Sequence, residues 1–187
     1  GKESNLKNIT KNENFEFYNY DINNESEIEE SLKDVTMIFH IAALADIVPS
    51  IKNPKLYFKS NVIGTFNLLK KCQDKGIKKI IYAASSSCYG LARYPTKETF
   101  DISPQYPYAF TKYIGEKSVI HWSKIYGIKY ISIRIFNAYG TRVRTTCVYG
   151  AVLGVVLKQK LAGKPFTVLG DGNQARDFIY ATDVAEA

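Results

Sequence analysis

The sequence predicts an α/β fold built on a doubly wound parallel sheet, because short apolar runs alternate with longer amphipathic stretches along the chain. Three runs, Val35–Ala43, Lys79–Ala84 and Tyr130–Ile135, have the continuous apolar character of strands that are buried on both faces. Strands that alternate with helical stretches imply βαβ units, and therefore parallel pairing with helices on both faces of the sheet. In such a fold, ligands bind at the carboxyl ends of the strands.

The remaining elements follow from local periodicity and from capping residues. Phe15–Ile22 alternates apolar and polar residues, which predicts an additional strand. Ser26 belongs to a group of capping residues ahead of a short helix, on which Ile28 and Leu32 share one face. Three longer helices are expected over 54–76, 107–127 and 151–163, each with a proline at its start or a glycine at its end. Apolar stretches over 166–169 and 178–180 come last.

The composition excludes several classes of protein. The chain has 187 residues, of which 45% are hydrophobic and 23% charged, as in globular proteins rather than disordered or fibrous ones. It has no run of about 18 apolar residues and no signal-peptide segment, so we expect no membrane partner. The net charge of +7 comes from scattered lysines and arginines, which favours an anionic small molecule over nucleic acid as a partner.

Cysteine and histidine usage argues against metal and disulfide chemistry. Cys72, Cys88 and Cys147 lie far apart without Cys-x-x-Cys spacing, and the histidines are His40 and His121 alone. This pattern predicts no metal site and no disulfide framework. Free thiols are typical of the reducing cytoplasm, which is the expected location.

Two tyrosine–lysine pairs at a spacing of four lie on one expected helix, Tyr108/Lys112 and Tyr113/Lys117. Each pair shares a helix face, but the step of five between them turns the helix by about 140°, so the pairs cannot serve one site. An ammonium beside a phenol lowers the phenol pKa, which lets the phenol exchange a proton with a substrate hydroxyl during hydride transfer. We assign this chemistry to Tyr108 and Lys112, near the start of the helix, and packing or surface roles to the second pair. Tyr106 is a weaker competitor, because no lysine follows it at i+4.

Ser85, Ser86 and Ser87 directly follow a buried strand. A hydroxyl at this edge can hydrogen-bond a substrate hydroxyl or a developing oxyanion. A lone serine there would more often cap a turn, but three in a row upstream of Tyr108 favour a functional role. A nucleophilic serine is disfavoured, because its Gly-x-Ser-x-Gly context is absent.

Three further polar residues have two interpretations each. Asp21 could accept a hydrogen bond from an adenine amino group or form an Asx turn. Asn61 lies mid-helix beside residues with a buried pattern, although a helical asparagine usually faces solvent. Arg176 follows a glycine-rich turn, where it could hold a phosphate or pair with Asp171 or Asp177.

In their order along the chain, these residues resemble the extended short-chain dehydrogenase/reductases, and among them the NAD-dependent sugar-nucleotide epimerase/dehydratase group. Each matching segment is modest alone, but seven in the family order are a specific signal. The resemblance implies a Rossmann-like fold and NAD as the cofactor. The matching segments are Asp21-Ile22, His40–Leu44, Ser60–Thr65, Ala84–Gly90, Pro107–Lys112, Arg134–Gly140 and Gly170–Phe178.

The resemblance also implies roles for individual positions. Ser85 would bond the reacting sugar hydroxyl, Tyr108 would be the acid/base, and Lys112 would hold the nicotinamide ribose. The implied cofactor-binding residues are Tyr108 and Lys112, Asp21 and Ile22 at the adenine, Ile41, Ala42 and Ala43 along the ribose–pyrophosphate path, Asn61 in support, and Phe136 near the nicotinamide. The implied substrate-binding residues are Ser86, Ser87, Asn137 and Arg176, the last two at the diphosphate of the nucleotide sugar.

One departure from the family pattern concerns its Gly-x-x-Gly-x-x-Gly phosphate loop, which is not found before Phe15. The family pattern would place that loop upstream of Gly1 and the rest of the substrate domain after Ala187. We therefore expect an internal fragment that lacks the first βα unit and binds NAD poorly by itself. Residues 1–140 would form the incomplete NAD-binding domain, and 141–187 a partial substrate-binding region interleaved with it.

The residues after Ser85 narrow the expected reaction. Family 4,6-dehydratases carry Asp-Glu there, because elimination of water needs its own acid and base, whereas Ser86 and Ser87 do not titrate near neutral pH. Epimerisation at C4 needs no second pair, so we expect a 4-epimerase of UDP-glucose or UDP-N-acetylglucosamine. The alternatives are a dehydratase, decarboxylase or reductase of the family, and a non-catalytic nucleotide-binding module. The helices over 54–75 and 107–126 match the pair that family dimers bury, which implies a homodimer.

Overall fold

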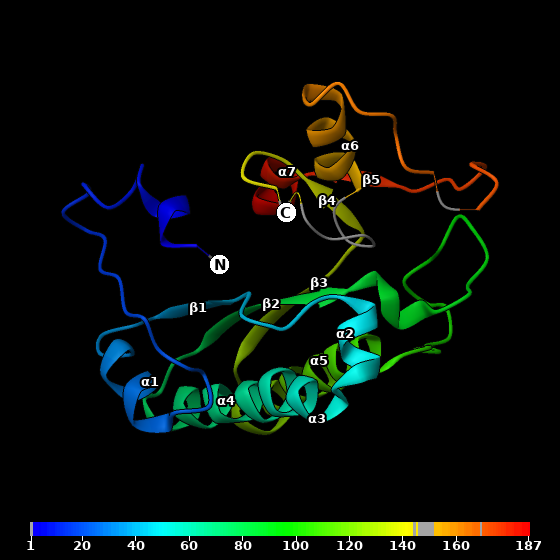
Figure 1. The fold of residues 1–187 in the computed structure, drawn as a ribbon. Coiled ribbons are helices and arrows are strands. Elements are labelled where there is room, and N and C mark those ends of the chain that lie inside the picture. The colour runs from blue at the N-terminus through cyan, green and yellow to red at the C-terminus, as the bar shows by residue number, and fades with distance from the viewer. Residues whose placement is uncertain (1, 144, 146–151, 169) are drawn as a thin grey trace.

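The computed structural model describes residues 2–143, 145, 152–168 and 170–187, and its core is a three-stranded parallel sheet (Figure 1). In the sheet register, Ile38 lies opposite Ile80, and Ile80 lies opposite Tyr130. Each strand lies on the apolar run that predicts it, so the α/β class with parallel pairing is confirmed. The strands are β1 (Met37–His40), β2 (Lys79–Ser85) and β3 (Lys129–Ile135), in the order β1-β2-β3.

The connection from β1 to β2 is almost entirely helical. A short helix, α2 (Ile47–Lys52), is followed by α3 (Pro54–Tyr57), the π-helical segment η2 (Phe58–Ile63) and α4 (Gly64–Asp74). The helix predicted from Pro54 is therefore present, but a π-helical segment interrupts it. Such wide turns are frequent at functional sites, and this one contains the buried Asn61.

The connection from β2 to β3 returns through the longest helix. The 3-10 turn η3 (Ser86–Tyr89) follows β2, an irregular segment runs to Tyr106, and α5 (Pro107–Tyr126) leads back to β3. Gly127 ends α5 in the left-handed region at φ 67°, where a glycine has no steric penalty. The bounds expected from Pro107 and Gly127 are therefore observed.

The hydrophobic core lies between the sheet and the helices α1 (Glu25–Ser31), α4 and α5, which lie below the sheet in Figure 1. Leu69 from α4, Tyr82 from β2 and Val119 from α5 have no exposed surface. The short helix α1 adds Ile28, so the apolar face expected for that helix is buried. Full burial of such a side chain contributes roughly 1.5–3 kcal/mol, so this cluster is the main cohesive feature of the fold.

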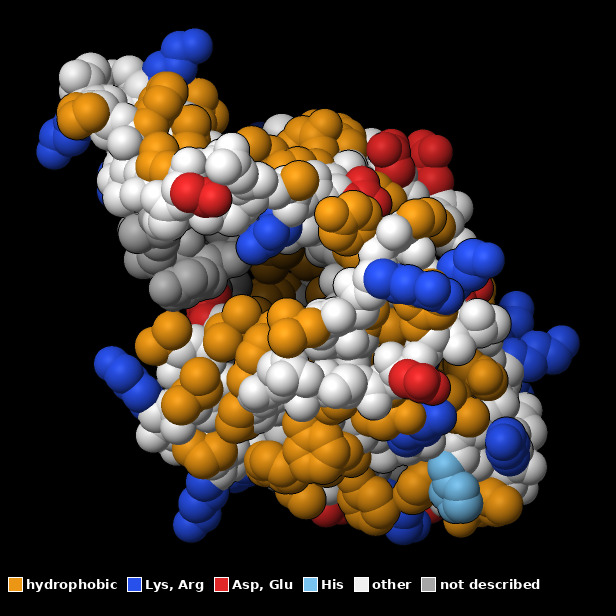
Figure 2. All heavy atoms as spheres, turned by 90° about the vertical axis from the view of Figure 1, so that its right-hand side faces the viewer, with side chains coloured by type: hydrophobic (Ala, Val, Ile, Leu, Met, Phe, Trp, Pro, Cys, Tyr) orange, Lys and Arg blue, Asp and Glu red, His pale blue; other side chains and the backbone are white. Residues whose placement is uncertain are grey.

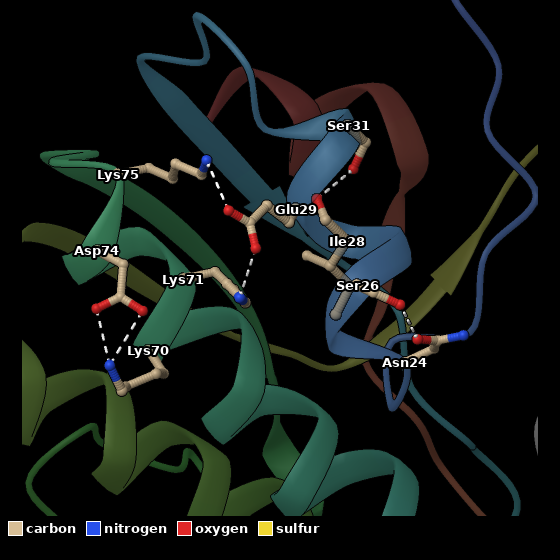
Figure 3. Close-up of polar contacts among 9 residues, drawn as sticks. All are labelled: Asn24, Ser26, Ile28, Glu29, Ser31, Lys70, Lys71, Asp74 and Lys75. Carbon is tan, nitrogen blue, oxygen red and sulfur yellow. Dashed lines mark hydrogen bonds and ion pairs between the residues drawn. The ribbon is translucent and has the colours of Figure 1, made fainter.

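The contact between α1 and α4 has a polar border (Figure 3). The Glu29 carboxylate lies 2.9 Å from the ammonium nitrogens of both Lys71 and Lys75. These two lysines lower the pKa of Glu29 to about 2. Because ion pairs at an exposed carboxylate contribute little stability, they orient α1 on α4 rather than hold it there.

The segment Phe15–Ile22 is irregular, and the prediction of a strand there is wrong. Phe17 and Tyr18 are about half exposed, at 50% and 41%. Alternation indicates only that side chains share a face, whereas a strand also needs a neighbour for its backbone hydrogen bonds, and no described strand pairs with this segment. Side chains hold the segment in place instead: the Tyr20 hydroxyl donates to the Glu30 carboxylate at 3.0 Å.

The last part of the chain forms a second, two-stranded parallel sheet. It pairs β4 (Asn137–Tyr139) with β5 (Phe178–Tyr180), and α6 (Val152–Leu161) and α7 (Ala181–Glu186) lie beside it (Figure 1). This sheet joins residues from both sides of position 140, so the division into 1–140 and 141–187 stays a prediction. Cys147, Leu169 and the start of the helix predicted over 151–163 lie outside the described residues.

Two further findings concern membranes and thiols. None of the helices in the described ranges has the length and apolar character needed to cross a membrane. Cys72 and Cys88 are buried free thiols, and burial raises the pKa of Cys72 to about 11. A thiol with so high a pKa stays protonated and unreactive at neutral pH.

Candidate active site

The carboxyl end of β2 and the first turn of α5 bring a serine and a tyrosine together. Ser85 is the last residue of β2 and is buried opposite Ile135 of β3. Pro107 begins α5, because proline at the first helical position gives up no hydrogen bond, and Tyr108 follows it. The Tyr108 hydroxyl donates to Ser85 Oγ at 3.4 Å. The two side chains expected at the reacting hydroxyl therefore meet at the edge of the sheet where ligands bind in this fold.

Lys112 lies one helical turn beyond Tyr108 and is buried, with 4% of its surface exposed. Its ammonium nitrogen lies 4.3 Å from the centroid of the Tyr82 ring, and the Tyr82 hydroxyl donates to the Lys112 carbonyl oxygen at 3.2 Å. Gly115 allows the Tyr82 hydroxyl to lie this close to α5, because a β-carbon at position 115 would overlap that hydroxyl. Burial lowers the pKa of Lys112 to about 8, while the Glu116 carboxylate acts in the opposite direction.

The acidity of Tyr108 differs from the expectation based on spacing. Burial raises the pKa of Tyr108, the hydrogen bond with Ser85 acts in the opposite direction, and Asp46 adds to the increase. The prediction that Lys112 lowers this pKa is therefore wrong for the structure described. The reason is that desolvation of the phenol has the larger effect, and the ammonium is directed at the ring of Tyr82.

The serine run forms a small hydroxyl cluster. Ser85 Oγ lies 2.7 Å from Ser87 Oγ, and the Ser87 backbone N–H donates to Ser85 Oγ at 3.3 Å. Ser85 therefore caps the turn η3 and at the same time faces Tyr108, so the capping role and the functional role do not exclude each other. Ser86 lies between the two and is half-buried.

Asn61 connects three parts of the chain beneath the site. Its amide oxygen accepts from the Leu44 backbone N–H at 2.8 Å, and its amide nitrogen donates to the Leu44 carbonyl at 3.0 Å and to Thr111 Oγ1 at 3.1 Å. Thr111 precedes Lys112 on α5 and is also fully buried. These bonds hold the segment after β1 against α5, so Asn61 supports the site, and a direct contact with a cofactor stays a prediction.

His40 is a member of this buried network that the sequence alone does not single out. Its Nε2 lies 2.8 Å from Thr65 Oγ1, and the Thr65 hydroxyl donates its only proton to the Asn61 carbonyl at 2.7 Å. Nε2 must therefore carry the proton in the bond to Thr65. Burial, with a contribution from Lys112, lowers the pKa of His40 to about 3, so this histidine is neutral and structural. The only sequence signal for this role is the position of His40 within the apolar run Val35–Ala43.

Arg134, which is partly buried, and the buried Glu116 form an ion pair that also lies outside the expected set of site residues. Arg134 Nη2 lies 2.9 Å from Glu116 Oε1, and its Nε lies 3.1 Å from both carboxylate oxygens. Arg134 Nη1 donates to the Tyr89 hydroxyl at 2.7 Å, and the guanidinium lies over the Tyr89 ring at 4.9 Å. The pair thus connects β3, α5 and the loop after β2, one turn beyond Lys112.

Of the residues expected toward the adenosine end, Ile41, Ala42 and Ala43 directly follow β1. Ile22, Ile41 and Ala42 share one hollow, and the exposed Ala43 follows them. Asp21 lines a neighbouring polar hollow, but its Oδ1 accepts from the backbone N–H and the side-chain amide of Asn23, at 2.9 and 2.8 Å. Both interpretations of Asp21 therefore remain compatible, since the Asx turn leaves Oδ2 outside these bonds.

Phe136 and Asn137 connect β3 to the second sheet, and Arg176 precedes β5 of that sheet. Phe136 follows β3 directly and is 40% exposed, while Asn137 Nδ2 donates to the Asp177 carbonyl at 2.8 Å. The Arg176 side chain is exposed and donates to the Ala175 carbonyl. No hydrogen bond or ion pair within the described ranges joins these residues to Tyr108. Figure 2 shows the molecule hollowed between the sheet-and-helix layer below and the C-terminal unit above.

The donor set at this edge fits a dinucleotide. Lys112 takes part in none of the ion pairs found among the described residues. The Tyr82 ring stabilises the positive charge of its ammonium group, but a ring does not accept N–H hydrogen bonds as well as an oxygen atom does. A ribose hydroxyl would supply such an oxygen. Ile22, Ile41 and Ala42 offer an apolar wall of the kind that a nucleoside contacts. The parts of the chain that the structure describes contain no cluster of His, Cys, Asp or Glu side chains able to hold a metal ion.

A parallel α/β sheet that has a serine and a tyrosine in contact at the carboxyl ends of its strands, and a buried lysine one helical turn beyond the tyrosine, is the arrangement of the short-chain dehydrogenase/reductase class. The particular family follows from comparison with known proteins. The chain belongs to the NAD dependent epimerase/dehydratase family, which matches residues 1–187.

Individual relatives support the same assignment. A UDP-glucuronate 4-epimerase of Thermodesulfobacterium geofontis is 34% identical over 183 residues, which are 96% of this chain and 55% of that protein. The solved UDP-N-acetylglucosamine 4-epimerase of Methanobrevibacter ruminantium, in complex with UDP-N-acetylmuramic acid, is 33% identical with a TM-score of 0.91, and the match covers 97% of this chain and 59% of that one. The solved UDP-glucuronic acid 4-epimerase of Bacillus cereus, in complex with UDP-glucuronic acid and NAD, is 31% identical with a TM-score of 0.88. That match covers 97% of this chain and 56% of the other. The chain therefore spans little more than half the length of these relatives.

Proposed function

We propose that the protein carrying this sequence is an NAD-dependent nucleotide-sugar 4-epimerase acting on a UDP-linked sugar. The observation that carries the proposal is the contact between the Tyr108 hydroxyl and Ser85 Oγ, with the buried Lys112 one helical turn away. This set supplies a proton acceptor, a hydrogen-bond donor to the reacting oxygen and a cation for the cofactor ribose. A module that only binds nucleotides has no need of all three.

The reaction proposed for these residues returns every proton and hydride that it removes. Bound NAD supplies the hydride acceptor and donor at sugar C4. Tyr108 takes the proton of the C4 hydroxyl while the Ser85 hydroxyl bonds the same oxygen, and Tyr108 keeps that proton while the 4-keto sugar turns over. Tyr108 then returns the proton to the carbonyl oxygen as hydride arrives on the other face. Only the configuration at C4 changes.

Ser86 and Ser87 support epimerisation over dehydration. Elimination of water from the sugar needs a second acid and base beside the reacting carbon, and a serine hydroxyl does not ionise near neutral pH. In the structure, Ser87 instead hydrogen-bonds Ser85 at 2.7 Å, so it belongs to the same hydroxyl cluster and adds no titrating group. We propose Asn137 and Arg176 as contacts for the substrate diphosphate, and Asp21, Ile22, Ile41, Ala42, Ala43, Asn61 and Phe136 as residues along the cofactor path.

The exposed apolar face of η2, α4 and α5 supports the proposal of a homodimer. Phe58 packs edge-on against Phe110 at 6.0 Å, and both remain more than a third exposed. Ile63 and Phe66 extend the same apolar surface, at 50% and 45% exposed. Hydrophobic side chains also gather over the helix layer in Figure 2. A patch of this kind on the helices marks a protein contact, and the mass of the protein in solution tests whether a second copy covers it.

The experiment uses the protein at its natural length, with NAD and either UDP-glucose or UDP-N-acetylglucosamine. Proton NMR of the sugar follows the appearance of the C4 epimer. Tyr108→Phe removes the group that exchanges the proton, so we expect a rate at least about 100-fold lower. Tyr113→Phe, on the same helix but beside the exposed Lys117, is the matched control and keeps the wild-type rate. A wild-type rate in Tyr108→Phe would reject the mechanism, whereas carbon dioxide release from UDP-glucuronate would assign a decarboxylase.

A further inference from the structure

One guanidinium joins three elements around the reacting edge of the sheet. Arg134 of β3 directs its Nε and Nη2 to the Glu116 carboxylate on α5, with contacts of 2.9 and 3.1 Å. Its Nη1 donates to the Tyr89 hydroxyl at 2.7 Å and to the Glu98 carbonyl at 3.3 Å. The guanidinium also lies over the Tyr89 ring, 4.9 Å from its centroid. Arg134 therefore binds α5 with one edge of its planar group and the turn η3 with the remaining nitrogen.

The α5 end of this connection lies on the side of the helix that carries the site. Tyr108, Lys112 and Glu116 follow each other at spacings of four, so they lie one turn apart along one side of α5. Glu116 is buried, with 4% of its surface exposed, so water competes little for its carboxylate. A charge-assisted contact of this bidentate kind also fixes the orientation of the two groups. Arg134 therefore holds the third turn of the helix whose first turn carries Tyr108.

The other end of the connection is the turn that follows Ser85. Tyr89 is the last residue of η3 and is 5% exposed, and Ser87, which bonds Ser85 Oγ at 2.7 Å, lies two residues before it. The Cys88 carbonyl accepts from the Ser103 backbone N–H at 2.9 Å, which fixes the turn to the segment that precedes α5. The position of Tyr89 therefore sets how the hydroxyl-bearing turn lies against α5.

The contact between Ser85 and Tyr108 leaves little room for displacement. At 3.4 Å, their hydroxyls lie at the long end of the range for an O–H···O hydrogen bond. A shift of about 1 Å between η3 and α5 would separate the two groups that the reaction needs at one oxygen, and such a misplacement can lower a rate by about 100-fold. Lysine would keep the charge of Arg134 but, as a point charge on a flexible stem, could not reach the carboxylate and the phenol together.

We propose that Arg134 is a positioning residue of the site, because its guanidinium holds the serine-bearing turn η3 in register with the helix that carries Tyr108. This inference rests on the proposed function, in which Ser85 and Tyr108 act on the same sugar oxygen. None of the hydrogen bonds that Arg134 makes in the described part of the chain goes to Ser85 or Tyr108, so it acts through Glu116 and Tyr89.

Arg134→Lys tests the proposal in the protein at its natural length, with NAD and the UDP-sugar that it epimerises. A turn out of register leaves sugar binding in place and disturbs the proton transfer, so we expect kcat to fall by about 10–100-fold while KM for the sugar changes by less than about threefold. Arg93→Lys is the matched control and keeps the wild-type kcat, because Arg93 also lies over an aromatic ring, that of Phe100 at 5.1 Å, but is exposed. A wild-type kcat in Arg134→Lys, or a loss confined to KM, overturns the proposal.

A second substitution distinguishes positioning from a general loss of stability. Ser85→Ala removes the hydroxyl that is to be positioned and should lower kcat of the wild-type protein by about 10–100-fold. In the Arg134→Lys protein this hydroxyl is already displaced, so the factor by which Ser85→Ala lowers kcat should be at least about fivefold smaller there. Equal factors in the two backgrounds would mean that the two residues act independently and would reject the proposal.

Tyr89→Phe provides a variant that keeps the pair of Arg134 and Glu116 intact. It removes only the hydroxyl that accepts from Nη1, while the aromatic ring stays under the guanidinium. We expect a smaller fall in kcat, about 3–10-fold, and no further fall when it is combined with Arg134→Lys. If Arg134→Lys does not fold, Tyr89→Phe with and without Ser85→Ala decides the question by the same criteria.

Crystal structures of the two variants separate this inference from the proposed function, because they need no turnover. We expect the hydroxyls of Ser85 and Tyr108 to move apart to more than about 4 Å. An unchanged separation rejects the role of Arg134 even if Tyr108→Phe abolishes epimerisation. A displaced turn in a protein that epimerises no UDP-sugar supports the positioning role and rejects the proposed reaction.

Discussion

Replacing the buried Lys112 with methionine should reveal how much stability the folded protein loses by burying this ammonium. Burial lowers the pKa of Lys112 from 10.5 to about 8. A difference of about 2.5 pH units corresponds to about 3 kcal/mol, at 1.36 kcal/mol per unit. At neutral pH the folded state carries this penalty, and methionine, of similar length but uncharged, removes it.

The sign of the pH dependence follows from the proton count. Between pH 8 and pH 10.5 the unfolded chain keeps a proton on Lys112 that the folded protein has lost. Stability therefore rises with pH across this window, and below pH 8 the penalty is present in full. Lys112→Met lacks this term, so its advantage in free energy of unfolding should be largest at pH 7 and should shrink by about 3 kcal/mol toward pH 10.5.

Urea denaturation of wild type and Lys112→Met without nucleotide, at pH 7 and pH 10.5, measures how the difference between their free energies of unfolding changes with pH. The comparison cancels the effects of pH on all other groups and the packing change caused by methionine. Lys117→Met is the matched control, because it makes the same substitution at an exposed position of the same helix. A difference between wild type and Lys112→Met that does not change with pH, or that grows as pH rises, would refute the reasoning.

Two other predictions concern packing around the same helix. Gly115→Ala places a β-carbon against the Tyr82 hydroxyl and should lower the free energy of unfolding by about 1–3 kcal/mol. Adding Tyr82→Phe removes that hydroxyl and should restore part of the loss. A double variant as unstable as Gly115→Ala would contradict this prediction. Glu116→Gln removes the carboxylate from the partly buried Arg134 guanidinium and should lower the free energy of unfolding by about 1.5–3 kcal/mol in urea denaturation. Glu116→Gln with Arg134→Met should lose less, and equal losses would show that the pair is not the cause.

Local features of the sequence determined most of the secondary structure. The apolar runs identify β1, β2 and β3, because β-branched and aromatic residues favour strands. The expected burial on both faces is wrong for β1 and β3, since Phe39 and Ile131 are 62% and 49% exposed. Pro107 and Gly127 bracket α5, since the proline ring and the left-handed φ of glycine act within a few residues. The positions of Ser85 and Tyr108 could also be anticipated, because each follows directly from the end of one element and the start of another.

The tertiary structure decided which groups meet and how strongly burial acts on them. Asn61 and Thr111 are hydrogen-bonded although they lie 50 residues apart, and His40 and Thr65 are joined across 25 residues. Periodicity records which face of an element is apolar, but it does not record the partner that a buried polar group finds on another element. For the same reason the spacing of Tyr108 and Lys112 gave the wrong direction for the phenol pKa. Desolvation depends on everything packed around a group, whereas spacing along one helix describes only a single neighbour.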